Sequence, residues 1–182
     1  PEFTDFETNN QAPLFDGINS FIEGPSRLLN DRAAFTMAGW VLPTSDQSNR
    51  TGLWGQNDAI EFGFINNSTL QLWTPAGSVN VAYGSTVNEW HHIVAVGTGT
   101  ILQIYKDGQL AAESSSNGGN YGSSTFTFNA GGGGIFDASG NLFEGLMDEI
   151  SVWTRALSAQ DIAGLLKGKV AVDFDPHIKT DI

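Results

Sequence analysis

Short β-rich runs, separated by turn residues, recur along almost the whole chain. They lie at residues 13–16, 20–23, 35–42, 51–55, 59–65, 69–74, 79–83, 90–97, 101–106, 109–114, 124–129 and 143–153. Alternation is clear in several runs, since Leu70 and Leu72 share the face opposite Trp73. Asp107-Gly108 and the segment 66–68 are typical of tight turns between paired strands. This pattern predicts an all-β antiparallel jelly-roll sandwich of two packed sheets.

One helix is predicted near the end of the chain. Ile150, Val152 and Trp153 favour a strand, and Ser158 follows five residues later with an acid, Asp161, three residues beyond it. That spacing is typical of a capping box at a helix start. Apolar residues then recur at helical spacing, which predicts one short C-terminal helix over 158–167 that Gly168 would end.

Four motifs occur in a characteristic order. They are Phe15-Asp-Gly17, the F-T-x-x-x-W-V run at 35–41, the W-H-H-I-V-A-V and I-Y-K-D-G runs at 90–96 and 104–108, and F-x-G-x-x-D-E at 143–149 followed by the helix start. Together they resemble the laminin-G-like domains of the concanavalin A-like lectin/glucanase superfamily. The resemblance covers residues 12–167. It leaves 1–11 as a leader or cloning remnant and 168–182 as a linker or tail.

The charge of the chain restricts its partners. The formal net charge is −12, with only 8 basic residues, so a nucleic acid would be repelled. No apolar run approaches the roughly 20 residues that a membrane-spanning helix needs, which predicts no membrane insertion. The chain has no cysteine, so neither a disulfide framework nor thiol chemistry is available. An acidic surface is compatible with calcium and with neutral glycans.

The sequence does not support catalysis. The laminarinase-like glucanases of the superfamily carry an E-x-D-x-x-E strand that places three acids on one face, and this chain has no such string. Asp58 and Glu61 would point to opposite faces of a strand, as would His91 and His92. No G-x-S-x-G motif is present. We therefore predict that the chain is not an enzyme.

Calcium is the metal that the resemblance implies, because proteins of this family often hold one near the edge of the sandwich. Calcium prefers several hard oxygen ligands. By the resemblance, Asp16, Asn19 and Asp148 would supply some of them, and nearby carbonyl groups would supply the rest. The alternative is that Asp16 and Asp148 are turn or loop residues whose carboxylates accept backbone N–H groups.

A sugar site needs an aromatic platform beside fixed polar groups. Trp40, Trp90 and Trp153 lie in strand patterns that predict core positions. Three other aromatic residues have polar or glycine-rich surroundings and are the candidate platforms: Trp54, Trp73 and Tyr121. Hydrogen bonds to a sugar would come from Gln56, Asn57, Asp58, Asn117 and Asn120. The alternative for these polar residues is ordinary loop polarity.

The resemblance and the residue pattern together predict a non-catalytic carbohydrate-binding module that is stiffened by calcium and binds a polysaccharide or oligosaccharide. It would be a secreted or cell-surface bacterial domain, flanked by other domains of a polysaccharide-degrading enzyme or a surface protein. The first alternative is a laminin-G-type adhesion module that binds a protein. A glucanase-like catalytic domain is a remote second alternative.

Overall fold

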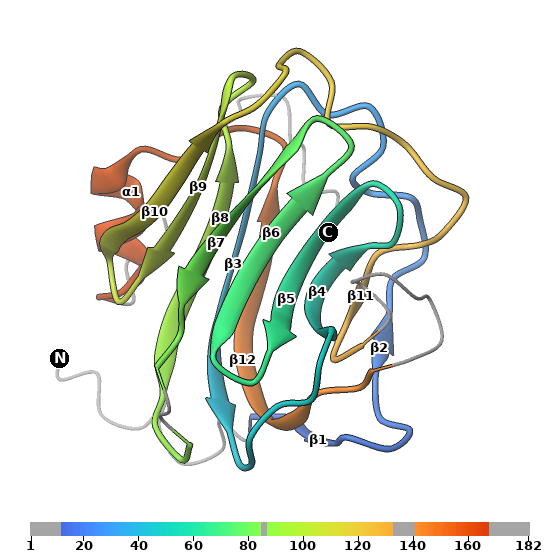
Figure 1. Cartoon of the computed structure of the whole chain (residues 1–182), viewed down its shortest axis with the longest axis vertical. Coiled ribbons are helices and arrows are strands. Elements are labelled where there is room, and N and C mark those ends of the chain that lie inside the picture. Colours follow the sequence, from blue (N-terminus) through green and yellow to red (C-terminus); the bar gives the residue numbers. More distant parts are fainter. Residues whose placement is uncertain (1–11, 85–86, 133–140, 168–182) are drawn as a thin grey trace, which may run out of the picture.

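The computed structural model describes residues 12–84, 87–132 and 141–167, in which two antiparallel sheets pack face to face (Figure 1). The first sheet, in spatial order, contains β1 (Leu14–Asp16), β12 (Glu144–Trp153), β3 (Phe35–Pro43), β8 (His91–Gly97), β9 (Ile101–Lys106) and β10 (Gln109–Ser115). The second contains β2 (Ile22–Glu23), β11 (Asn129–Ala130), β4 (Thr51–Gln56), β5 (Ile60–Asn66), β6 (Thr69–Thr74) and β7 (Gly77–Ala82). The chain crosses repeatedly between the two sheets, and the predicted all-β jelly-roll sandwich is confirmed.

The first and the last strand of the described chain pair at one edge of the first sheet. Strand β1 pairs with β12 so that Leu14 lies opposite Leu146 and Asp16 lies opposite Glu144. Strand β12 pairs in turn with β3, which places Asp148 opposite Trp40. These registers decide which of the predicted ligand residues can approach one another.

The predicted Asp107-Gly108 turn joins β9 to β10. Both residues have positive φ angles, 51° and 77°, as a two-residue turn of the hairpin type requires. Glycine reaches this region without a steric penalty, and aspartate tolerates it better than most residues do. The alternating pattern and the turn chemistry therefore agree along this hairpin.

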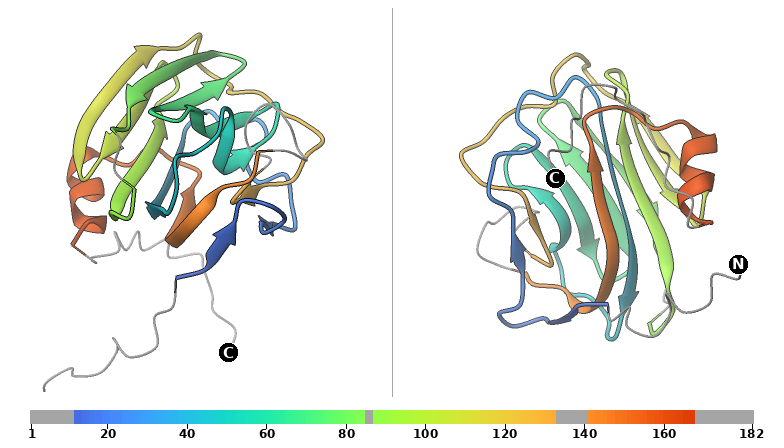
Figure 2. Two further views of the ribbon diagram at one scale, coloured as in Figure 1. Left: turned by 60° about the horizontal axis from the view of Figure 1, so that its bottom comes forward. Right: turned by 180° about the vertical axis from the view of Figure 1, so that it is seen from behind.

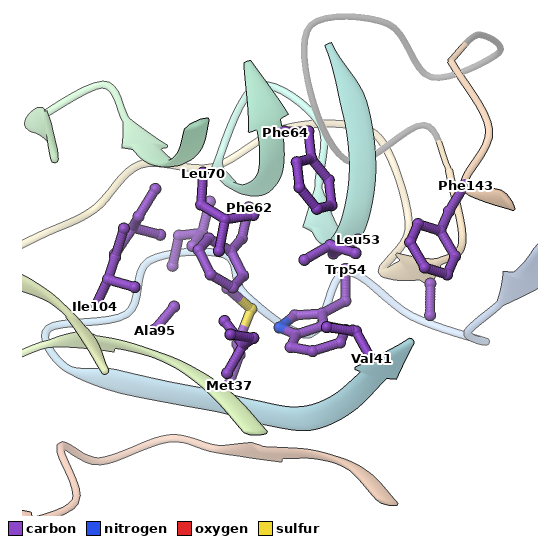
Figure 3. Packing of buried hydrophobic residues seen from close by; sticks show 14 of the residues in the cluster. Met37, Val41, Leu53, Trp54, Phe62, Phe64, Leu70, Ala95, Ile104 and Phe143 are labelled. Atoms are coloured by element: carbon purple, nitrogen blue, oxygen red, sulfur yellow. The ribbon is translucent and has the colours of Figure 1, made fainter. Parts of the chain in front are cut away.

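Apolar side chains from the inner faces of the two sheets form one large core (Figure 3). Met37 and Val41 of β3 face Phe62 and Phe64 of β5, and all four are buried. The core also contains Trp54, which is completely buried. A core of this size explains why a chain without disulfides holds a unique sandwich.

The helix α1 (Ala159–Leu165) packs on the outer face of the first sheet, as Figure 2 shows from behind. The predicted capping box is present: Ser158 Oγ accepts from Asp161 N, and Asp161 Oδ2 accepts from Ser158 N at 3.0 Å. Ile162 enters a second apolar cluster with Val94 and Tyr105. The predicted stop at Gly168 lies outside the described residues, as do the leader 1–11 and the tail 168–182.

The structure differs from the predicted strand at 124–129, where only Asn129–Ala130 pair as β11. The preceding residues pack against the loop that follows β2. Phe128 N donates to Ser26 O, and Gly24 N donates to Phe128 O. The segment is therefore a loop without a sheet partner over most of its length, in which Phe128 is partly buried against the core and Phe126 is exposed. In the described part of the chain, no helix is long and apolar enough to cross a membrane.

Candidate functional site

An open pocket of about 360 Å³ lies on the outer face of the first sheet, beside the end of α1. Residues distant in the sequence line it: Trp40 of β3, Trp90 just before β8, Asp148 and Glu149 of β12, and Leu165 and Leu166 at the end of the helix. The pocket volume lies within the range of small-molecule sites, which are mostly apolar with a few placed polar groups.

The strand registers assemble the floor of this pocket. Asp148, Trp40 and His92 lie side by side on β12, β3 and β8, because Trp40 is the register partner of both neighbours. The rings of Trp40 and His92 are 5.2 Å apart, so the histidine supports the indole from one side. Trp90 precedes His92 by two residues and so lies on the same side of the sheet. The result is a pair of tryptophans beside carboxylates.

The two tryptophans differ in exposure from what the sequence predicts. Trp40 is half-buried, and Trp90 is 39% exposed. The prediction that Trp90 lies in the core is therefore wrong. Its position before the first paired residue of β8 explains this, since the outer face of the sheet is covered by α1 only farther along the strand. Trp153 is half-buried and packs against the second cluster.

A β-bulge brings the two carboxylates to the pocket. Consecutive residues of a regular strand point to opposite faces, but the register of β12 shifts between Asp148 and Ser151. Glu149 has a φ of 50°, a left-handed conformation that is uncommon for a side chain of this size. Ser151 Oγ donates to Glu149 O at 3.1 Å, and Glu149 N donates to Asp148 Oδ1 at 2.8 Å, so the strained turn is held locally. Bulges of this kind often re-aim side chains next to functional sites.

His92 behind the pocket is a neutral group. It is 3% exposed, and burial lowers the pKa of its imidazole, with the Asp107 carboxylate opposing that shift. Its Nδ1 has no hydrogen-bond partner. The negative groups that line the pocket therefore face no imidazolium from this residue near neutral pH.

Two of the three predicted aromatic platforms are wrong. Trp54 and Tyr121 are completely buried, so neither can present a ring face to a sugar. Trp54 packs 5.9 Å from Phe62 in the core. The Tyr121 ring meets Phe35 edge-on at 5.1 Å, and its hydroxyl accepts from Gly99 N at 2.8 Å. Both are structural residues.

The third platform, Trp73, lies on the outward face of the second sheet. It is half-buried and has Glu61 and Ser78 as its register neighbours. Its role as a ligand residue stays a prediction. Trp73 does not line the pocket formed by Trp40 and Trp90. The surface around Trp73 and the Trp40–Trp90 pocket are therefore alternative locations for one ligand.

The predicted polar residues that follow Trp54 are mostly inside the protein. Gln56 is completely buried, where its amide oxygen accepts from Leu29 N at 3.0 Å and its amide nitrogen donates to Asn30 and Ser124. Asn57 is 4% exposed. Gln56 ties loops together and is not available to a ligand. Asp58 is exposed in the β4–β5 turn, with a φ of 61°.

Asn117 and Asn120 do come together, at a separate hollow of about 380 Å³ between loops at one end of the sandwich. Asn120 is already engaged at both ends of its amide, since Nδ2 donates to Asp31 at 3.1 Å and Oδ1 accepts from Gly122 N at 2.7 Å. The described lining has no aromatic side chain. The described residues of this hollow therefore offer no aromatic platform to a sugar ring.

The three predicted calcium ligands are not assembled into one site. Asp16 and Asn19 are neighbours in the β1–β2 loop, but Asp16 lies opposite Glu144, four residues from Asp148 on β12. Four residues of strand span about 13 Å, far more than two ligands of one ion can be apart. Asp16 Oδ1 accepts three N–H groups, from Asn19, Ile18 and Ser20, which hold the pKa of this exposed carboxyl well below its usual range. Among the described residues, no group of three or more His, Asp or Glu side chains could hold a metal.

Comparison with known proteins identifies the family. A laminin G family model, described as the concanavalin A-like lectin/glucanases superfamily, matches residues 16–163. The chain belongs to this superfamily. No curated protein sequence matches it closely enough to be significant. The family resemblance read from the four motifs is thereby confirmed.

Several solved structures share this fold at low identity. A Bacteroides ovatus protein, named as a suspected carbohydrate-binding protein, has a TM-score of 0.70 and 17% identity over 84% of this chain and 45% of its own. Domain 4 of the Geobacillus stearothermophilus arabinanase AbnA, solved with arabinotriose, has a TM-score of 0.67 and 18% identity, covering 85% and 76%. A Limulus polyphemus pentraxin has a TM-score of 0.64 and 14% identity, covering 87% and 82%. The present chain spans less than half of the Bacteroides protein.

Proposed function

We propose that this domain is a non-catalytic carbohydrate-binding module whose ligand occupies the pocket between Trp40 and Trp90. The observation that carries the proposal is the pairing of two indoles, one of them 39% exposed, with the two carboxylates of the β12 bulge. Sugar rings offer apolar C–H faces to an indole and donate hydroxyl groups to carboxylate oxygens. The structural neighbours include two proteins whose names refer to carbohydrate.

The dimensions of the pocket suit a short piece of a polysaccharide. A cavity of about 150 Å³ accepts benzene, and a sugar ring with its hydroxyl groups is larger, so about 360 Å³ is enough for roughly one to two sugar units. The pocket is open, so a longer chain can continue out of it on either side. The carboxylates and the net charge of −12 favour a neutral glycan over an acidic one.

The proposed mechanism is equilibrium binding without bond cleavage. A glycosidase needs two carboxyl groups that flank the scissile bond, at about 5–5.5 Å or about 6.5–9.5 Å from each other. Asp148 and Glu149 are consecutive residues of one bulge, and they approach the pocket from the same strand. Both can accept hydroxyl groups from one side of a sugar, which serves recognition. Release of reducing ends from a β-glucan would support the remote glucanase alternative.

The wider setting is part of the proposal. We infer a secreted or cell-surface domain, flanked by other domains of a polysaccharide-degrading enzyme or a surface protein. The arabinanase domain is an example of such an arrangement in a fold neighbour. A structural calcium ion stays part of the proposal, but its ligands are left open, because Asp16, Asn19 and Asp148 are not brought together and the described residues contain no group of three or more acidic or histidine side chains that could hold the ion.

Affinity electrophoresis against neutral polysaccharides tests the proposal. The panel contains arabinan, xylan, β-glucan and mannan, each run with calcium and with EDTA. We expect one polysaccharide to retard the domain, and Trp90→Ala to remove most of the retardation. Ile18→Ala is the matched control, because Ile18 is 78% exposed and does not line the pocket. Loss of retardation in EDTA would tie calcium to binding or to the fold.

Protein binding remains the second candidate, and one observation favours it. The β1–β2 segment exposes several large apolar side chains, namely Leu14 (67%), Ile18 (78%), Phe21 (53%) and Ile22 (50%). Exposed apolar residues that gather in one segment are a feature of interaction surfaces. If no polysaccharide retards the domain, this segment becomes the leading candidate, and a pull-down with wild type against Ile18→Asp tests it.

A further inference from the structure

Strands β2 and β11 lie at one edge of the second sheet (Figure 1). A second, smaller hollow is formed by residues of this edge and the loops beside it. Its volume is about 130 Å³, and the described residues that line it are Phe21, Glu23, Phe126, Thr127 and Asn129. This hollow shares no residue with the Trp40–Trp90 pocket. The proposed sugar site between Trp40 and Trp90 uses none of these side chains, although Phe21 also belongs to the exposed β1–β2 segment.

The aromatic side chains of the hollow are exposed without a structural reason. Phe21 is 53% exposed and Phe126 is 37% exposed, although phenylalanine is among the residues most often buried. Neither belongs to either apolar cluster of the domain. Two exposed aromatic rings that line the same small hollow offer apolar surface to a ligand.

The polar side of the hollow contains a buried acceptor without a donor. Asn129 is 8% exposed, and its Oδ1 has no hydrogen-bond partner. Its position is fixed, because β11 pairs with β2 on one side and β4 on the other, and its register partner on β4 is Gly55, which has no side chain to donate. Buried carbonyl oxygens are normally paired, so an orphan that lines a hollow indicates a missing donor.

The carboxylate beside Asn129 is held in place. Glu23 is the register partner of Asn129 on β2, and its Oε1 accepts from Thr127 Oγ1 at 2.6 Å. The hollow thus presents two fixed acceptors, an amide oxygen and a carboxylate, next to two aromatic rings. A ligand that matches must donate hydrogen bonds and also have an apolar face.

We propose that this hollow is a second carbohydrate subsite, which holds one neutral sugar ring against Phe21 and Phe126 while a ring hydroxyl donates to Asn129 Oδ1. A volume of about 130 Å³ is slightly below the roughly 150 Å³ of a cavity that accepts benzene, so the hollow takes no more than one sugar ring. Glu23 disfavours uronic acids. The class of ligand follows from the proposed function, whereas the location and the residues rest on the geometry of the hollow alone.

The two subsites lie on different sheets, so one domain can contact two polysaccharide chains or two separate parts of one chain. Each site alone would be weak, and the pair raises the apparent affinity for a polysaccharide above that for a short oligosaccharide. Phe21 and Phe126, which do not pack in the core, would thus serve to bind the ligand.

The test is a nuclear magnetic resonance titration of the ¹⁵N-labelled full chain with arabinotriose, xylotriose, cellotriose and laminaritriose. The reporters are the Asn129 side-chain amide for the small hollow and the Trp90 indole N–H for the large pocket. We expect a saturable shift of the Asn129 signal with at least one sugar. Phe21→Ala and Phe126→Ala should each weaken that binding by about fivefold to tenfold, and Phe126→Tyr should restore it. Ile18→Ala is the exposed control.

The outcomes separate the two proposals. If Trp90 shifts with a sugar while Asn129 does not, the second subsite is overturned and the proposed function stands. If the Asn129 shift persists in both phenylalanine variants, the second subsite is also overturned. A silent Asn129 together with a silent Trp90 overturns both proposals. The variants change exposed side chains, so unchanged backbone spectra show that each retains its fold.

Discussion

Removal of the Trp90 side chain should weaken sugar binding by an amount that its exposure sets. A tryptophan can bury up to about 250 Å². Since Trp90 is 39% exposed, a ligand can cover about 100 Å² of it, which at about 25 cal/mol per Å² amounts to about 2.5 kcal/mol. A sugar that covers half of that area contributes about 1.2 kcal/mol, so Trp90→Ala should raise Kd about sevenfold.

Calorimetric titration with the polysaccharide that retards the domain measures this change. Wild type, Trp90→Ala and Ile18→Ala are compared at one pH and one calcium concentration. Trp73→Ala is included, because Trp73 is the rival platform on the other sheet. The reasoning is refuted if Kd is unchanged in Trp90→Ala, or if Trp73→Ala alone weakens binding. Equal weakening by Ile18→Ala would show that the effect is not specific to the pocket.

Three further predictions concern the fold. Burial lowers the pKa of His92 below 6.5, so its contribution to the free energy of unfolding is complete above pH 6.5 and is lost as the pH falls below that value. Denaturant unfolding should therefore give a smaller free energy of unfolding at pH 5.5 than at pH 7.5, and the difference between the two pH values should be smaller in His92→Gln. Gly97→Ala places a Cβ 2.3 Å from Phe35 and 2.8 Å from Tyr121, which should cost about 1–3 kcal/mol, and a thermal midpoint equal to wild type would contradict the packing. Ser158→Ala removes the N-cap of α1 and should cost about 1 kcal/mol of unfolding free energy, with Ser158→Asp as a control that retains a cap.

The fold could be predicted from the sequence because local signals agree along most of the chain. The alternation in β6, the turn at Asp107-Gly108 and the capping box at Ser158 each have a physical cause that acts within a few residues. The segment 124–129 failed as a strand because its partner is a loop that is distant in the sequence. Local patterns do not identify such a partner.

The candidate site could not be predicted because two β-bulges change which face a side chain occupies. A register shift between Gly52 and Trp54 turns both Leu53 and Trp54 toward the core. The polar residues after Trp54 had suggested that its side chain is exposed, and this suggestion was wrong. A second shift after Asp148 brings Glu149 to the same pocket as its neighbour. An alternating pattern does not reveal a shift of one residue.

Contacts distant in the sequence account for the remaining differences. Tyr121 lies in a glycine-rich loop that has little local packing, yet Phe35 and Gly99 bury it and bond its hydroxyl. Trp90 belongs to a motif of the strand β8 but precedes its first paired residue. Tyr121 was predicted to be exposed and Trp90 to be buried, and both predictions were wrong. Phe35 and Gly99 lie 22 or more positions from Tyr121 in the sequence, whereas the exposure of Trp90 follows from its place before β8.

The location of the sugar is the central claim, and the tryptophan indole signals test it most directly. The chain has 5 tryptophans, of which Trp40 and Trp90 line the pocket, Trp73 lies on the other sheet and Trp54 is buried in the core. In a ¹⁵N titration with the polysaccharide fragment that binds, Trp90 and Trp40 should shift in a saturable way while the buried Trp54 does not. A saturable shift of Trp73 with Trp90 and Trp40 unchanged would contradict the account and move the site to the other sheet.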